Sequence, residues 1–380
     1  MRVEKIEDRW SQEQLVTGIS TGQWLSMLSD NGWDVSPDYW LRAAWIGLLG
    51  LPMSVLRLIE QRRYGEQIAN MAIDPVPIFG LGHWRSGTTH LHNLLGRDPQ
   101  HDYTTVYQVV FPDTFLTSRE WGPKLLAKAL PAKRSYDNMP HGWFEPAEDE
   151  IGLMKLARGR SFYVSVMFPD RAEEYRKYID FADASDEDRR LFQDALTTMI
   201  KKCMIANGGK RMIIKSCMHS ARIPLLLDLF PDARFVHVHR HPARVFTSMV
   251  HMRTKVDWEN FMHRPTKEFI ELRREHTAQV GEILFRRLIE DRELIPEGNL
   301  VEIAYDDLCG DEFEVVRGIY ERFELPGWEE YAPLLRDYLD RIAGYKVNKF
   351  EIDDETLDFV YDRWRLVYDT YGYEREFTGR

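Results

Sequence analysis

One segment of the chain combines glycines, hydroxyl side chains and an arginine in a spacing that suits phosphate binding. Residues 76–81 form an apolar run that is typical of a short buried strand. A turn with Gly82 and Gly87 follows, and then leucines with helical spacing at Leu91, Leu94 and Leu95. In a strand, glycine turn and helix of this kind, backbone N–H groups and the positive end of the helix dipole converge on one anion. The segment therefore predicts an anion cradle.

The residue after Gly87 argues against a triphosphate ligand. The spacing from Gly82 to Gly87 matches a nucleotide-binding P-loop, but Thr88 follows where such loops carry a lysine. That lysine reaches the β- and γ-phosphates of a triphosphate. The cation of this turn is instead Arg85. We therefore expect the loop to hold a phosphate on a ligand that has no γ-phosphate.

Two later blocks accompany this loop in the chain. Residues 235–248 read as a strand that ends in Arg240, with Ser248 eight residues further on a helix. Residues 301–308 read as another strand followed by Tyr305. In order and spacing, from about residue 75 to residue 330, the three blocks resemble the PAPS-dependent sulfotransferases (PAPS is 3′-phosphoadenosine 5′-phosphosulfate). Arg85 and the stretch 215–219 look most like the broad bacterial branch of that family.

The resemblance implies a donor site and a reaction. The glycine loop would correspond to the 5′-phosphosulfate loop, 235–248 to the 3′-phosphate block, and Tyr305 to a tyrosine near the adenine. The PAPS-binding residues so implied are Arg85, Ser86, Gly87, Thr88, Thr89, His90, Arg240, Ser248 and Tyr305. The expected reaction is in-line transfer of a sulfuryl group to a hydroxyl, for which the family needs no metal. Arg85 and Lys215 are the expected catalytic cations. In the late loop that closes over the same phosphate in the family, Lys346 and Lys349 are weaker candidates.

The base that accepts the hydroxyl proton has two candidates. In the cytosolic members of the family a catalytic histidine follows a lysine by two residues. Here Cys217 stands at that offset from Lys215, and His219 lies two residues further on. We favour His219, because a neutral imidazole suits deprotonation of a hydroxyl near neutral pH. The alternative is a carboxylate such as Glu148, in the acidic cluster 145–150 at the start of an expected helix.

Composition limits the partners. The formal net charge of −11 argues against a general nucleic-acid binder. The three cysteines are widely spaced, so they indicate neither a disulfide framework nor a metal site, which fits a reducing compartment. The charged N-terminus is not followed by the apolar stretch of a secretory signal. We therefore expect a cytoplasmic protein, and the sequence does not indicate an oligomeric state.

An apolar stretch at residues 43–56 contains Pro52 and falls short of the ~20 residues that a spanning helix needs. The simpler interpretation is a buried helix broken at Pro52. The alternative is a segment that makes peripheral contact with a membrane or covers a lipophilic channel. Aromatic residues in the middle of the chain favour an apolar acceptor: Trp121, Trp143, Phe144, Phe162, Tyr163 and Phe168.

The remaining pattern predicts an α/β fold. From residue 75 the chain alternates strands and helices, which predicts a P-loop-like parallel sheet flanked by helices, with ligands beyond the carboxyl ends of the strands. Strands are expected at 76–81, 212–214, 233–239 and 300–304. We expect a helical N-terminal extension at 1–74 and a sulfotransferase domain at 75–380. Within that domain, 100–205 is expected to be a mostly helical insertion on the substrate side.

These observations together predict a sulfotransferase that moves a sulfuryl group from PAPS to a hydroxyl of a small, hydrophobic or lipid-like acceptor. The alternative function is a P-loop NTP-dependent kinase or a nucleotide-binding regulatory protein. Thr88 at the lysine position argues against that alternative.

Overall fold

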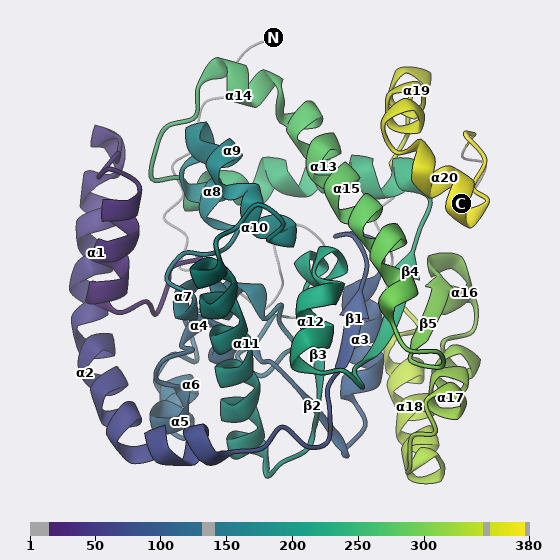
Figure 1. The fold of residues 1–380 in the computed structure, drawn as a ribbon, viewed down its shortest axis with the longest axis horizontal. Helices are drawn as coiled ribbons and strands as arrows, with labels where there is room; N and C mark the ends of the chain where they lie inside the picture. Colours follow the sequence, from purple (N-terminus) through teal and green to yellow (C-terminus); the bar gives the residue numbers. More distant parts are fainter. Residues whose placement is uncertain (1–14, 131–140, 345–349, 377–380) are drawn as a thin grey trace.

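A five-stranded parallel sheet forms the centre of the molecule in the computed structural model, which describes residues 15–130, 141–344 and 350–376 (Figure 1). The strand order is β2-β3-β1-β4-β5. The strands are β1 (Ile78–Leu81), β2 (His101–Tyr103), β3 (Arg211–Lys215), β4 (Arg234–His239) and β5 (Leu300–Ala304). This is the α/β, P-loop-like architecture that the sequence predicts.

Helices cover both faces of the sheet, because neighbouring strand residues point to opposite sides. On one face Ile78 and Val236 pack with leucines of α3 (Thr88–Gly96) and with α17 and α18. On the other face Phe79 and Phe235 pack with α7, α11 and α12. The apolar residues of the inner strands β1, β3 and β4 are buried on both sides, as a parallel sheet requires.

The other helices fall into two groups along the chain. Those before β3 are α1 (Thr21–Asp30), α2 (Trp40–Asn70), α4 (Val106–Val110), α5 (Phe115–Ser118), α6 (Gly122–Leu125), α7 (Glu150–Leu156), α8 (Val164–Met167), α9 (Ala172–Tyr175), α10 (Lys177–Asp180) and α11 (Asp186–Asn207). Those after β3 are α12 (Ile223–Leu229), α13 (Pro242–Asn260), α14 (Lys267–Glu271), α15 (Arg273–Asp291), α16 (Tyr305–Gly310), α17 (Glu312–Arg322), α18 (Trp328–Ile342), α19 (Asp354–Arg363) and α20 (Arg365–Tyr371). Short 3₁₀ turns are η1 (Pro37–Tyr39), η2 (Pro169–Arg171), η3 (Cys217–Ala221) and η4 (Arg292–Leu294).

The register of the sheet brings the ends of its central strands to one edge. Gly80 of β1 pairs with Lys215 of β3, and Leu81 pairs with His237 of β4. His239 in turn lies beside Ala304 of β5. The segments that follow these strands therefore leave the sheet side by side. They include every block that the sequence singled out.

Helix α2 differs from the expectation in two ways. It runs without interruption through Pro52, where a break was expected. Contacts on both sides of the proline hold it together: Thr21 Oγ1 donates to the Gly47 carbonyl at 2.7 Å, and Thr21 N–H donates to Ser54 Oγ at 3.1 Å. The interpretation as a buried helix is also wrong. In the described part of the chain, the stretch Pro37–Asn70 passes a length and hydropathy test for a membrane span, with a mean hydropathy of 1.4 over 18 residues, of which 22% are buried.

Other differences concern elements with weak local signals. Strand β2 was not expected, because its residues His101, Asp102 and Tyr103 carry no apolar pattern. It forms because it pairs in parallel with the edge of β3. The expected C-terminal helix at 353–371 is two helices, α19 and α20, which meet at the buried Trp364.

Candidate active site

The turn between β1 and α3 has a backbone that glycines make possible. Gly82 has φ +140° and Gly87 has φ +110°. A Cβ atom on Gly87 would lie 2.5 Å from Cδ2 of Tyr305, and one on Gly82 would lie 2.6 Å from the Val238 carbonyl. A side chain at either position is therefore excluded by the backbone conformation and by space. The first N–H groups of α3 have no carbonyl partner within the helix and face the turn.

Two arginines and a serine gather around this turn. Arg85, itself at φ +70°, donates from Nε to Ser248 Oγ at 2.9 Å. Arg240 donates from Nη1 to the Arg85 carbonyl at 3.1 Å, and its guanidinium lies 3.8 Å from the centre of the Tyr305 ring. The structure thus brings together Arg85, Gly87, Arg240, Ser248 and Tyr305 from three separate parts of the chain.

The same turn holds a buried hydroxyl that suits an anion. Ser86 is 2% exposed, and its Oγ has no hydrogen-bond partner among the described residues. An unpaired buried hydroxyl is costly, and a phosphate oxygen is an acceptor that would satisfy it. Together with the two arginines, it makes the cradle fit a phosphorylated ligand.

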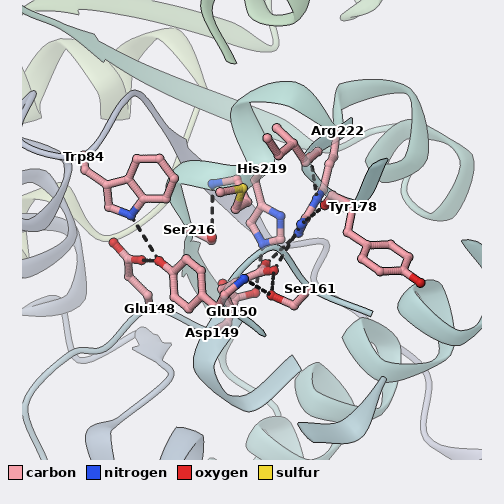
Figure 2. A network of polar contacts seen from close by, with 12 residues as sticks. Trp84, Glu148, Asp149, Glu150, Ser161, Tyr178, Ser216, His219 and Arg222 are labelled. Atoms are coloured by element: carbon pink, nitrogen blue, oxygen red, sulfur yellow. Dashed lines mark hydrogen bonds and ion pairs between the residues drawn. The ribbon is translucent and has the colours of Figure 1, made fainter. Parts of the chain in front are cut away.

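Three consecutive carboxylates before and at the start of α7 pair with three basic residues at the end of β3 and in the segment after it. Figure 2 shows the three carboxylates with His219 and Arg222. The pairs are Glu148 with Lys215 at 2.6 Å, Asp149 with His219 at 2.8 Å and Glu150 with Arg222 at 2.6 Å. This one-to-one pairing attaches the helical insertion to the edge of the sheet.

Two of these pairs lie in the interior of the protein. Asp149 and His219 are both 0% exposed, and the His219 ring packs edge-on against Phe79. Arg222 binds both oxygens of Glu150 and donates to two backbone carbonyls, while Ser161 Oγ donates to Glu150 at 2.6 Å. This depth of burial favours a structural role for both pairs. Nδ1 of His219 and Oδ1 of Asp149 have no hydrogen-bond partner among the described residues.

The Glu148 carboxylate has a different setting. Besides Lys215, it accepts hydrogen bonds from the hydroxyl of Tyr163 and from Sγ of Cys217, the latter at 3.5 Å. Cys217 Sγ is in turn 3.9 Å from Oγ1 of Thr88, the first residue of α3. Glu148 therefore lies near the end of the phosphate turn, where α3 starts, and its side chain is 17% exposed.

Electrostatics keep Glu148 charged. Burial alone would raise the pKa of Glu148, but the charge and hydrogen bond of Lys215, together with Tyr163 and Cys217, lower it below its ordinary value. Burial and the Glu148 charge raise the pKa of Cys217, so this thiol is not a nucleophile near neutral pH. The site thus contains an ionised carboxylate held by a lysine.

Some expected site residues lie elsewhere. His90 points to α17, where its Nε2 is 3.4 Å from Glu312. The placement of His219 in the core does not suit a group that must reach a substrate. Lys346 and Lys349 lie outside the described residues.

Two contributors were not recognised in the sequence. Tyr163 was noted only among the aromatic residues of the insertion, yet its hydroxyl donates to Glu148 and accepts from Trp84 Nε1 at 3.1 Å. No local pattern marks this arrangement, because Trp84, Glu148 and Tyr163 come from three separate loops. The acidic cluster at 145–150 was the one signal in the sequence that pointed to this place.

The fold and the turn define an α/β protein of the phosphate-loop class, with Thr88 at the position of the usual lysine and Arg85 as the cation of the turn. A sequence model described as Sulfotransferase family matches residues 77–330. The chain belongs to this family.

Its relatives agree with that assignment. The omega-hydroxy-beta-dihydromenaquinone-9 sulfotransferase Stf3 of Mycobacterium bovis is 31% identical over 369 residues, which are 97% of this chain and 94% of the relative. Among solved structures, sulfotransferase STF9 from Mycobacterium avium matches with a TM-score of 0.65 at 18% identity, over 96% of this chain and 98% of that one. Sulfotransferase STF1 from Mycobacterium tuberculosis H37Rv matches with a TM-score of 0.60 at 17% identity, over 90% of both chains. The two solved structures share the fold.

We predict that Asp149→Ala lowers the free energy of unfolding by about 3 kcal/mol, because it leaves the buried imidazole of His219 without its partner. Urea unfolding monitored by circular dichroism measures this loss. Glu148→Gln is the matched control, since it changes the adjacent carboxylate at the partly open pair, and we expect a loss under about 1 kcal/mol. Equal losses for both variants would contradict the division between core pairs and a site pair.

Proposed function

We propose that this sulfotransferase uses PAPS as its donor and transfers the sulfuryl group in line to a hydroxyl of a lipid-like acceptor. The observation that carries the proposal is the meeting of two sets of residues at one sheet edge. Arg85, Arg240 and Ser248 surround the glycine turn, and the Glu148–Lys215 pair lies beside the start of α3. The first set suits an anionic donor, and the second suits proton transfer from an acceptor.

The donor side offers separate contacts for separate phosphate groups. The turn, with Ser86, Thr88 and Thr89 at the start of α3, would hold the 5′-phosphosulfate end. Arg240 and Ser248, which follow β4, would hold the 3′-phosphate, and Tyr305 lies within reach of the same ligand. Arg85 contacts Ser248 and therefore connects the two parts. Arginine forks are suited to such oxygens because they donate two parallel hydrogen bonds.

PAPS would supply an electron-poor sulfuryl group and a phosphate leaving group. The work of the protein is to orient the two oxygens and to stabilise charge that develops between them. Arg85 would neutralise charge on the leaving phosphate. Lys215, at the end of β3, is the second cation available beside the turn.

Glu148 is the base that the geometry favours, in place of His219. Its carboxylate is ionised, borders the turn through Cys217 and Thr88, and is held in orientation by Tyr163 and Lys215. It would take the proton of the acceptor hydroxyl as the new S–O bond forms.

The lipid character of the acceptor is supported by two observations. Stf3, whose name specifies a hydroxylated dihydromenaquinone, aligns with nearly the whole chain. The surroundings of the Glu148 network are apolar: Trp84 and Tyr163 pack in one cluster with Phe162, Met218, Met249 and Leu284. A terminal hydroxyl on a long apolar chain matches such surroundings.

We predict that Arg240→Ala weakens binding of adenosine 3′,5′-bisphosphate by roughly 1.5–3 kcal/mol, about 10- to 150-fold, because a charge-assisted phosphate contact is lost. Isothermal titration calorimetry measures the affinity. Arg234→Ala is the matched control. Arg234 is the first residue of β4, at the end of the strand away from Arg240, and its guanidinium lies over the Phe323 ring. Unchanged affinity in a folded Arg240→Ala protein would remove the 3′-phosphate assignment.

We predict that Glu148→Gln lowers the single-turnover rate by about 10²–10⁴ while the affinity for adenosine 3′,5′-bisphosphate stays within a few-fold, since a base acts on the acceptor and not on the donor. Rapid-quench kinetics with labelled PAPS and one accepted alcohol measure the rate. Tyr163→Phe keeps the carboxylate but removes one of its hydrogen bonds, and we expect a loss of about tenfold. If a folded His219→Gln protein loses the chemical step and Glu148→Gln keeps it, His219 is the base and Glu148 is not.

A further inference from the structure

The outer side of α2 is apolar where a surface helix is normally polar. Every residue that is exposed between Trp40 and Ile59 is apolar. Leu41, Trp45, Leu48, Pro52, Val55 and Ile59 follow one another at intervals of three and four residues, so they lie on one side of the helix. We call this side the α2 face. It extends over about 20 residues, or roughly 30 Å of helix.

Two charged residues of the same helix, Arg42 and Glu60, point into the protein. Arg42 is 3% exposed and donates to the Phe261 carbonyl at 2.9 Å. Glu60 is 2% exposed and pairs with Lys202 at 2.5 Å. Along this part of the helix, Arg42 and Glu60 face inward and apolar side chains face solvent, which is the reverse of an ordinary amphipathic surface helix. Leucines of the α2 face are more than half exposed, with Leu41 at 79% and Leu48 at 57%. A continuous apolar patch of this length marks an interaction site.

The buried pairs also exclude a transmembrane orientation. Removing α2 from the fold would leave Glu60 and Lys202 without each other and would break the contact of Arg42 with Phe261. Trp24 Nε1 further donates to the Ala43 carbonyl at 2.9 Å, which fixes α1 to α2. The helix is therefore held flat on the protein, and a surface that covers it must approach from outside.

The ends of the α2 face carry the residues that anchor proteins in a lipid headgroup region. Trp33 and Trp40 are 57% and 63% exposed at its beginning. Arg62 and Arg63 are exposed just beyond its end. Indole rings favour the membrane–water interface, and arginines are complementary to lipid phosphates. The middle of the α2 face has no charged residue, which suits contact with the acyl chains beneath the lipid headgroups.

We propose that the α2 face docks this protein on a phospholipid bilayer, with α2 lying in the plane of the interface. The inference stands on α2 itself. Its link to catalysis, the delivery of a lipid acceptor from the same bilayer, rests on the proposed function.

Vesicle sedimentation of the full chain, without donor or acceptor, tests the proposal. The probes are vesicles of phosphatidylcholine, alone or with a minority of phosphatidylglycerol. The test variant is Leu41→Gln/Leu48→Gln/Val55→Gln, and the matched control is Leu294→Gln/Leu334→Gln/Leu366→Gln, which removes exposed apolar residues from η4, α18 and α20. Because all six residues are exposed, both variants should keep the thermal unfolding temperature of the unmodified protein.

We expect the unmodified protein and the control to bind both vesicles, and the test variant to bind roughly tenfold more weakly or worse, since affinity follows the buried apolar area. Arg62→Gln/Arg63→Gln should lose the extra binding that phosphatidylglycerol gives and keep binding to phosphatidylcholine. Binding of the test variant equal to that of the unmodified protein would overturn the proposal. A second result would also overturn it: the unmodified protein fails to bind vesicles and forms a dimer in sedimentation velocity, and the test variant is a monomer. A second copy of the chain would then cover the α2 face. Turnover of a water-soluble alcohol, measured separately, reports on the proposed function alone.

Discussion

The pairing of three consecutive carboxylates with Lys215, His219 and Arg222 determines how the active site is assembled. The basic residues come from the end of β3 and the segment after it, and the carboxylates come from the residues before and at the start of α7 in the helical insertion. Because Asp149 and Glu150 pair deep inside the protein, the position of Glu148 is fixed at the edge of the site. A shift of one residue would bury Glu148 and put a core residue in its place.

Such buried pairs are a costly way to join two segments, since each charge or polar group loses its hydration. They are specific for the same reason, because a wrong pairing would leave a buried group unsatisfied. The donor side depends on a steric constraint instead. Gly87 allows Tyr305 to approach the turn, and the guanidinium of Arg240 stacks on the Tyr305 ring. The carboxylate–base pairs and the close packing of Tyr305 on Gly87 both lie at the carboxyl edge of the sheet, and this is where the candidate site lies.

Much of this could be predicted from the sequence. The order of strands and helices predicted the fold, and the spacing of Gly82, Gly87, Arg240 and Ser248 led to side chains that the structure places together. The base could not be decided this way, because His219 and Glu148 differ in burial and not in local pattern. The orientation of α2 was equally hidden, since hydropathy alone does not tell an apolar side that faces the core from one that faces outward. Tyr163 joins the network through loops that no periodicity describes.

The dependence of turnover on pH tests the central claim most directly, that an ionised Glu148 and not an imidazole accepts the proton. Lys215 lowers the pKa of Glu148, so the base is present above the ordinary carboxylic range and is lost only as pH falls below it. Under saturating donor and acceptor, the account predicts a turnover number that is flat from about pH 7.5 down to about pH 5. A tenfold fall for each pH unit below about 6.5, the ordinary pKa of an imidazole, would contradict it.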